Sequence, residues 1–244
     1  MRKVIRCFIP RGFLEQLRNL EHSLRPLLYR GKRVECPICG AKYRKFLPFG
    51  RPVRKNALCP KCGSLERHRR LYLYLREKTG IFKERAVVLH FAPERGLSTV
   101  LSSHPKLQYV STDFEMPQVA VRSDITMLPF ETGTFDYVLC CDVLEHVPRD
   151  IDAMGELRRV LKQSGCAILR VPLNGKIETD EDLTVTDPVQ RRARYGQEDH
   201  VRYYGDNIVD RLESVGFRVS MANSMKEFVG RHGLSSEILY VCQP

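Results

Sequence analysis

The chain has 244 residues, with 40 lysines and arginines against 29 aspartates and glutamates, so its formal charge is +11. This length suits one full domain with an appendage, or two small domains. The balance of 43% hydrophobic and 28% charged residues excludes wholesale disorder, and no run approaches the roughly 18 apolar residues of a membrane span. We therefore expect a cytoplasmic protein.

The charge is divided unevenly along the chain. Residues 1–85 contain 23 basic and 6 acidic residues, whereas residues 86–244 contain 17 and 23. A basic front on an acidic body predicts two parts with different tasks. Either simple solubility or an anionic partner such as a nucleic acid accounts for the basic front.

The first expected element is a helix over residues 12–30. Its apolar residues recur at helical intervals, and they are Phe13, Leu14, Leu17, Leu20, Leu24, Leu27 and Leu28. We assign this helix to an N-terminal helical segment, residues 1–33.

Four of the nine cysteines then follow in two Cys-x2-Cys pairs within residues 34–65. Two such turns complete a tetrahedral four-thiolate site, which suits a structural Zn²⁺ ion and predicts a zinc ribbon. Two disulfides are the alternative, but they need an oxidising compartment. Gly40 and Gly63 follow the pairs, where a left-handed backbone is often needed. The predicted zinc ligands are Cys36, Cys39, Cys59 and Cys62.

A second helix is expected after the ribbon. Residues 64–80 carry a leucine stripe and end at Gly80, which predicts a linking helix within residues 66–85. Between the cysteine pairs, basic and aromatic residues alternate in a pattern that suits either nucleic-acid binding or the ribbon's own core.

From residue 86 onward, short apolar runs alternate with helical segments, which predicts a doubly wound parallel sheet over residues 86–244. The clearest helix spans 149–165, with Gly165 just past its end, and another is expected at 205–215. Two last strands would form an antiparallel pair at the sheet edge. In such sheets, ligands bind at the carboxyl ends of the strands.

Polar residues stand at four of those strand ends. Asp113 ends the second strand and could accept both hydroxyls of a ribose, although an aspartate that only forms a turn is the alternative. Asp124 could meet an adenine amino group, and Asp142, Glu145 and His146 follow the fourth strand. The first strand is followed by residues 90–96, which read HFAPERG and keep only one glycine.

Residues 84–244 resemble the class I S-adenosylmethionine-dependent methyltransferases, in the branch related to quinone biosynthesis. The likeness rests on DITMLPF, FDYV, VLEHV and AMGELRRVLK, read together. It implies a seven-stranded Rossmann-like sheet with S-adenosylmethionine at the strand ends. The first loop departs from the family pattern of an acid and three glycines, although Ala92 could replace one glycine and Glu94 could supply a carboxylate. The implied cofactor-binding residues are Phe91, Ala92, Glu94, Gly96, Asp113, Asp124, Ile125 and Asp142.

Two segments could supply acceptor binding and a catalytic base. His146 is available as a base, although the start of a helix there is equally a packing or capping feature. Residues 191–207 crowd polar groups where an insertion would close the pocket, or they form a solvated loop with a helix cap at Asp206. The predicted catalytic residues are His200, His146 and Asp142, and the predicted substrate contacts are Gln197, Asp199, His200, Arg202 and Tyr204.

These observations lead to one main hypothesis and two alternatives. The first is a methyltransferase acting on an oxygen or nitrogen of a polar small molecule or glycan. The second is an RNA methyltransferase that uses the basic ribbon to hold nucleic acid. The third is a binding protein that keeps the fold and lacks turnover.

Overall fold

The computed structural model describes residues 24–222 and 226–244, which form two compact units. Unit 1 comprises residues 1–73 and 225–235, and unit 2 comprises residues 74–224 and 236–244. Sequence analysis placed residues 225–235 in the body, whereas they fold with the ribbon. Most of the helix expected at 12–30 lies outside the described residues, of which 24–28 are helical.

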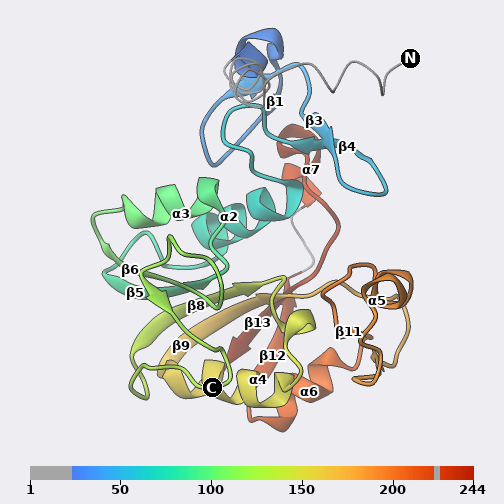
Figure 1. The fold of residues 1–244 in the computed structure, drawn as a ribbon. Helices are drawn as coiled ribbons and strands as arrows, with labels where there is room; N and C mark the ends of the chain where they lie inside the picture. The colour runs from blue at the N-terminus through green and yellow to red at the C-terminus, as the bar shows by residue number, and fades with distance from the viewer. Residues whose placement is uncertain (1–23, 223–225) are drawn as a thin grey trace. The chain divides into compact units, whose positions relative to one another are not determined.

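Unit 2 is built on the predicted seven-stranded sheet (Figure 1). The strand order is β12-β13-β9-β8-β5-β6-β7, in which neighbours from β9 to β7 run parallel and β13 runs antiparallel to both β9 and β12. The chain moves outward from β5 to β6 and then crosses back to β8, so the strand order reverses between β5 and β8. The strands are β5 (Ala86–Phe91), β6 (Leu107–Asp113), β7 (Val121–Arg122), β8 (Phe135–Cys141), β9 (Leu161–Arg170), β12 (Arg218–Ala222) and β13 (Leu239–Gln243).

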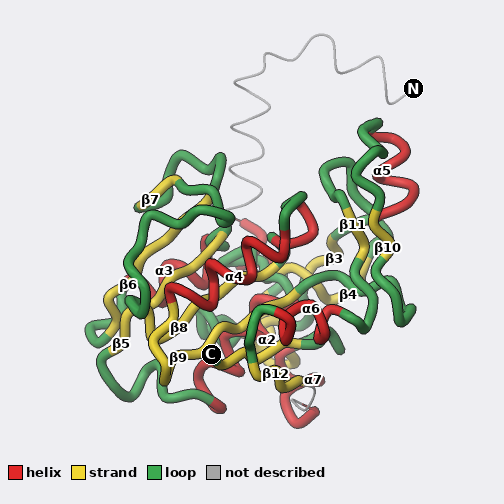
Figure 2. Tube along the Cα trace, turned by 90° about the horizontal axis from the view of Figure 1, so that it is seen from below, coloured by secondary structure: helices red, strands yellow, loops and turns green. Residues whose placement is uncertain are grey.

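Helices cover both faces of this sheet. The helix α3 (Arg95–Ser102) lies on one face, and α4 (Asp150–Val160) and α6 (Ile208–Ser214) lie on the other (Figures 1 and 2). The buried face of α4 consists of Ala153, Met154, Leu157 and Val160 at helical spacing. The smaller elements of unit 2 are the 3-10 helix Leu144–His146, α5 (Pro188–Tyr195), and the antiparallel pair β10 (Asp180–Glu181) and β11 (Arg202–Tyr203).

The helix expected over 149–165 is shorter than predicted. It ends at Val160, and β9 begins at the next residue. A Cβ atom at Gly165 would lie 2.9 Å from the carbonyl oxygen of Lys162 and 3.0 Å from that of Phe135. Gly165 is therefore needed for close strand contact and does not cap a helix.

Among its described residues, unit 1 contains two small antiparallel sheets, the helical residues 24–28 and two further helices. The turns that carry the cysteines follow β1 and β4, and both Gly40 (φ +67°) and Gly63 (φ +71°) adopt the predicted left-handed backbone. The elements are β1 (Arg30–Glu35), β2 (Lys42–Tyr43), β3 (Leu47–Phe49), β4 (Arg54–Leu58), α7 (Lys226–His232) and α2 (Glu66–Lys78), within which the boundary to unit 2 falls.

A buried arginine joins the parts of unit 1. The Arg69 guanidinium donates to the carbonyl oxygens of Ala57 and Ser64 at 2.8 Å and to that of His232 at 2.7 Å. It also stacks over the ring of Phe46 at 4.0 Å. These contacts hold residues 226–235 against the ribbon because the five N–H donors of one guanidinium can bond several carbonyls at once.

Every helix among residues 24–222 and 226–244 is too short or too polar to cross a bilayer.

Candidate functional site

A cavity of about 560 Å³ opens in unit 2 at the carboxyl ends of β5, β6 and β8. Its position beside the reversal of strand order is where ligands bind in open α/β sheets, and its size is that of a small-molecule site. Five carboxylates belong to its wall, and the described residues that line it include no lysine or arginine. The lining residues are Phe91, Ala92, Asp113, Phe114, Glu115, Ser123, Asp124, Ile125, Asp142, Val143, His146, Val147, Pro148 and Asp199.

Of the end of β5 and the loop that follows it, only Phe91 and Ala92 line the cavity. Ala92 has a φ of +45°, a conformation that glycine adopts with less strain, and its N–H donates to the Thr112 carbonyl at 3.0 Å. Glu94 instead lies 3.1 Å from Nε2 of His90 and precedes α3, whose first turn contains Gly96. Neither Glu94 nor Gly96 lines the cavity.

Two aspartates form the wall beyond β6. The Oδ1 atom of Asp113 accepts the backbone N–H groups of Glu115 at 2.8 Å and Met116 at 2.7 Å, which fixes the carboxylate at the end of the strand. The Oδ1 atom of Asp124 accepts the N–H and hydroxyl of Thr126, both at 2.8 Å, and these bonds lower the pKa of Asp124. Both carboxylates are therefore held in place before any ligand arrives.

A pair on α4 holds the far end of the Asp124 loop. Glu156 accepts the backbone N–H of Leu128 at 2.7 Å, and Arg159 donates to the carbonyl oxygens of Leu128 at 3.0 Å and Phe130 at 2.7 Å. The two side chains also bond to each other at 2.6 Å, which lowers the pKa of Glu156 and raises that of Arg159. The loop that carries Asp124 and Ile125 is thus tied to a helix.

Asp142 follows β8 directly and has a strained backbone, with a φ of +57°. Its carboxylate bonds to the guanidinium of Arg170 at the end of β9, which also bonds Glu237 at 2.6 Å. Sequence analysis did not single out Arg170, although its place at a strand end was a usable signal. The pairing orients the Asp142 carboxylate at the cavity wall.

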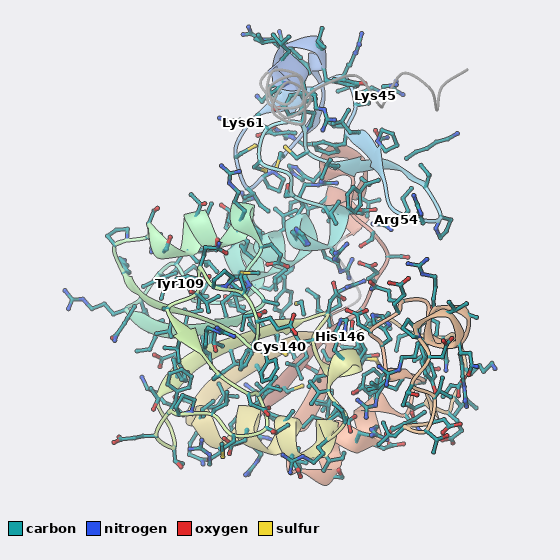
Figure 3. The ribbon with its side chains drawn as sticks, viewed as in Figure 1. Lys45, Arg54, Lys61, Tyr109, Cys140 and His146 are labelled. Atoms are coloured by element: carbon teal, nitrogen blue, oxygen red, sulfur yellow. The ribbon has the colours of Figure 1, made fainter. Side chains whose placement is uncertain are left out.

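The structure brings His146, Asp199 and His200 together. His146, labelled in Figure 3, has its Nδ1 atom 3.2 Å from Oδ2 of Asp199, and both residues line the cavity. The ring of His200 meets that of His146 edge-on, with ring centroids 4.7 Å apart. Burial and the neighbouring His146 lower the pKa of His200, which favours its neutral form.

Arg202 and Tyr204 have buried partners in place of the expected substrate contacts. Arg202 is fully buried and donates to the carbonyl oxygens of Leu144 at 3.0 Å, Pro148 at 2.9 Å and Val147. The hydroxyl of Tyr204, also buried, donates to Asp150 at 2.7 Å. Arg202 and Tyr204 thus hold the segment 144–148 in place. The predicted substrate contact Gln197 is exposed and does not line the cavity.

Unit 1 brings together the four predicted cysteines. Their sulfur atoms lie within 4.8 Å of one another, with Cys36 and Cys62 at 3.6 Å and Cys39 and Cys59 at 3.7 Å. A tetrahedron with Zn–S bonds of about 2.3 Å has edges of about 3.8 Å, so these spacings fit zinc. Hydrogen bonds from Cys39 and Cys59 lower the pKa of Cys36 to about 6.

The two cysteine turns are built alike. The N–H of Gly40 donates to the Cys36 carbonyl at 2.9 Å, and the N–H of Gly63 donates to the Cys59 carbonyl at 3.1 Å. The N–H groups of Cys36 and Cys59 in turn donate, each at 2.9 Å, to the carbonyl five residues further on. Both pairs thus present two sulfurs from the same local geometry.

Comparison with known proteins finds a match within unit 2. The profile of a family described as a methyltransferase domain matches residues 89–169, from within β5 to within β9. This segment is therefore similar to a methyltransferase domain.

Two curated relatives match shorter segments. An uncharacterized protein of Methanocaldococcus jannaschii is 43% identical over 58 residues, and sterol 24-C-methyltransferase of Schizosaccharomyces pombe is 39% identical over 56 residues. The matches cover 24% and 23% of this chain, and 25% and 15% of those proteins. The chain thus matches only a quarter or less of each curated relative's length.

Solved structures confirm the fold. The 4+2 cyclase SpnF superposes with a TM-score of 0.50 at 15% identity, covering 72% of this chain and 81% of that one. The predicted Rossmann-like sheet is thus confirmed, and its occurrence in a cyclase means that the reaction must be argued from the site.

Proposed function

We propose that unit 2 binds S-adenosylmethionine in the 560 Å³ cavity and transfers its methyl group to a polar small molecule or glycan. The observation that carries this proposal is the acidic lining of the cavity at the strand-order reversal. Carboxylates favour a cationic ligand, and the cofactor is a sulfonium. The methyltransferase profile over residues 89–169 supports the same assignment.

The described residues fit the parts of this cofactor. Asp113 is held at the end of β6, where a carboxylate can accept two ribose hydroxyls. Ile125 is buried beside Asp124. Ile125 offers an apolar surface to the adenine, and the Asp124 carboxylate offers an acceptor. Phe91 and Ala92 would contact the methionine portion, and Asp142 would face the sulfonium.

The cofactor supplies an electrophilic methyl group on a positively charged sulfur. The chain's own task is to place an acceptor atom in line with that methyl and to keep water away. His146 and Asp199 also line the cavity, and we assign them to the acceptor. His200 lies behind His146 and acts through it.

We also propose a structural zinc ion in unit 1, bound by Cys36, Cys39, Cys59 and Cys62. The sulfur spacings of 3.6 and 3.7 Å support it. All four positions are filled by protein, so the ion would stabilise unit 1 and take no part in methyl transfer.

Titration calorimetry with S-adenosylhomocysteine tests the cofactor site. We expect wild-type protein to bind one molecule per chain and Asp113→Ala to bind at least about 10-fold more weakly, because two hydrogen bonds to the ribose are lost. Asp210→Ala, at an exposed position on α6, is the matched control and should bind as wild type.

Absence of saturable binding up to about 1 mM, the upper end of ordinary enzyme affinities, would contradict the proposal. Equal affinity in Asp113→Ala and wild type would contradict the placement of the ribose.

A further inference from the structure

A second group of metal-ligating side chains lies in unit 2, beside the cavity. Glu145 and His146 belong to the 3-10 helix after β8, and His200 comes from the segment between α5 and β11. Each offers one ligand atom, and these atoms lie within 4.8 Å of one another. Glu145 and His200 are 1% and 2% exposed, whereas His146 reaches the cavity.

His200 is oriented as a metal ligand. Its Nδ1 atom lies 3.0 Å from the carbonyl oxygen of Tyr195, which can only accept, so Nδ1 carries the proton and Nε2 keeps a free lone pair. The Nε2 atom is fully buried and has no hydrogen-bond partner. A buried acceptor without a partner is costly, and a metal ion would satisfy it.

His146 shows a second feature of metal sites. Its Nδ1 atom contacts the carboxylate of Asp199 at 3.2 Å, and such a carboxylate commonly fixes the ring of a metal-bound histidine. With the buried carboxylate of Glu145, two imidazoles complete a three-ligand set typical of catalytic divalent metal sites.

Buried hydrogen bonds hold the segment that carries these ligands. Arg202 donates to the carbonyls of Leu144, Val147 and Pro148, on both sides of Glu145 and His146. The N–H of Val201, next to His200, donates to the Glu145 carbonyl at 2.9 Å. The ligands are therefore held together before an ion binds, as a precise metal site requires.

We propose that Glu145, His146 and His200 bind one divalent transition-metal ion, with an open coordination position directed into the cavity. We further propose, resting on the function proposed above, that the acceptor is a hydroxyl compound whose oxygen occupies the open coordination position. His146 is then a ligand and does not serve as the general base.

The chemistry balances without another reagent. Coordination lowers the pKa of the hydroxyl, as it does for metal-bound water, and its proton leaves to solvent through the cavity. An oxygen lone pair forms the new O–C bond to the methyl. The S–C bond breaks with its electron pair left on sulfur, which becomes a neutral thioether.

Metal titration of the full-length, zinc-loaded chain tests the proposal. Mn²⁺, Co²⁺ and Zn²⁺ are titrated separately by calorimetry, and the Co²⁺ form is also examined by absorption spectroscopy. We expect at least one of them to bind at one ion per chain beyond the four-cysteine site. The Co²⁺ spectrum should show ligand-field bands without a thiolate-to-cobalt charge-transfer band.

Two variants and two controls locate the ion. Glu145→Gln and His200→Asn should each weaken metal binding at least about 10-fold. Glu213→Gln, at an exposed position on α6, and His104→Asn change the same residue types away from the cluster and should bind as wild type. Thermal unfolding followed by circular dichroism, measured on every variant, reports whether unit 2 is folded, and S-adenosylhomocysteine binding tests the proposed function separately.

Several results would overturn the metal site. They are no additional saturable ion in wild type, a thiolate band from the additional Co²⁺ ion, or wild-type metal affinity in a folded Glu145→Gln or His200→Asn. Metal binding without S-adenosylhomocysteine binding would refute the proposed function and leave the metal site standing.

Discussion

The two clusters of ligating side chains in this protein differ in how they are assembled. In unit 1, four cysteines come from two turns of the same local construction, and together they could fill all the positions of a tetrahedral ion. In unit 2, Glu145 and His146 meet His200 from a distant segment, and the cluster opens toward a cavity. The first arrangement suits stability, and the second leaves room for a ligand.

The largest expected effect breaks the closed cluster. Cys59→Ser removes one thiolate, and because structural zinc contributes about 10 kcal/mol or more to folding, unit 1 should unfold and lose its ion. Metal analysis and amide hydrogen exchange over residues 30–58 measure this outcome. Unit 2 should still bind S-adenosylhomocysteine.

Cys166→Ser, which changes a half-buried cysteine of β9 outside the cluster, is the control and should keep the zinc. Retention of zinc in Cys59→Ser would show that Cys59 is not a required ligand, and native exchange without zinc would show that no ion holds unit 1 together.

The second-largest effect concerns Arg202, which holds the segment that carries Glu145 and His146. Arg202→Met removes a buried guanidinium that also pairs with Glu181 at 2.9 Å. The carbonyls of Leu144, Val147 and Pro148 then lose a buried donor, and Glu181 is left with Arg211 at 3.2 Å, so we expect unfolding free energy to fall by about 3–5 kcal/mol in urea titrations. Arg218→Met, at an exposed position on β12, should change it by less than about 0.5 kcal/mol. Equal stability of the two variants would mean that Arg202 does not support segment 144–148.

The smallest effect is a pH dependence at the Glu156–Arg159 pair, which holds the far end of the Asp124 loop. Hydrogen bonds from Arg159 and the Leu128 N–H lower the pKa of Glu156, so the unfolded chain takes up a proton more readily. The Glu156 carboxylate thereby contributes up to about 1 kcal/mol to the free energy of unfolding. This contribution is present above the pKa of Glu156 in the unfolded chain and is lost as pH falls through its pKa in the folded protein.

Urea titrations below about pH 4.5, the ordinary pKa of this group, should therefore show a steeper loss of stability in wild type than in Glu156→Gln. Glu213→Gln, at an exposed site, should keep the wild-type slope. Identical slopes in all three proteins would show that the Glu156 pair does not stabilise the loop.

Sequence predicted the parts of the molecule that depend on local spacing or on topology. The cysteine turns and their glycines depend on local spacing. The carboxyl ends of parallel strands lie at the same edge of a sheet, so Asp113, Asp124, Asp142 and His146 were expected at one edge. Ala92 takes up a glycine-like backbone, as its size suggested.

Other features depend on tertiary contacts that no local pattern records. Arg202 and Tyr204 are polar residues in a polar stretch, and only the folded chain shows that Leu144 and Asp150 are their partners. The same holds for Glu94, which pairs with His90. The return of residues 226–235 to the ribbon likewise rests on distant contacts, such as those of Arg69 and Glu35 with His232.

A crystal structure with S-adenosylhomocysteine bound tests the central claim most directly. We predict the ribose hydroxyls on the Asp113 carboxylate, the adenine beside Ile125, and the sulfur on the Asp142 side of the cavity, facing His146. A ligand bound elsewhere, or a cavity left empty at saturating ligand, would contradict the account.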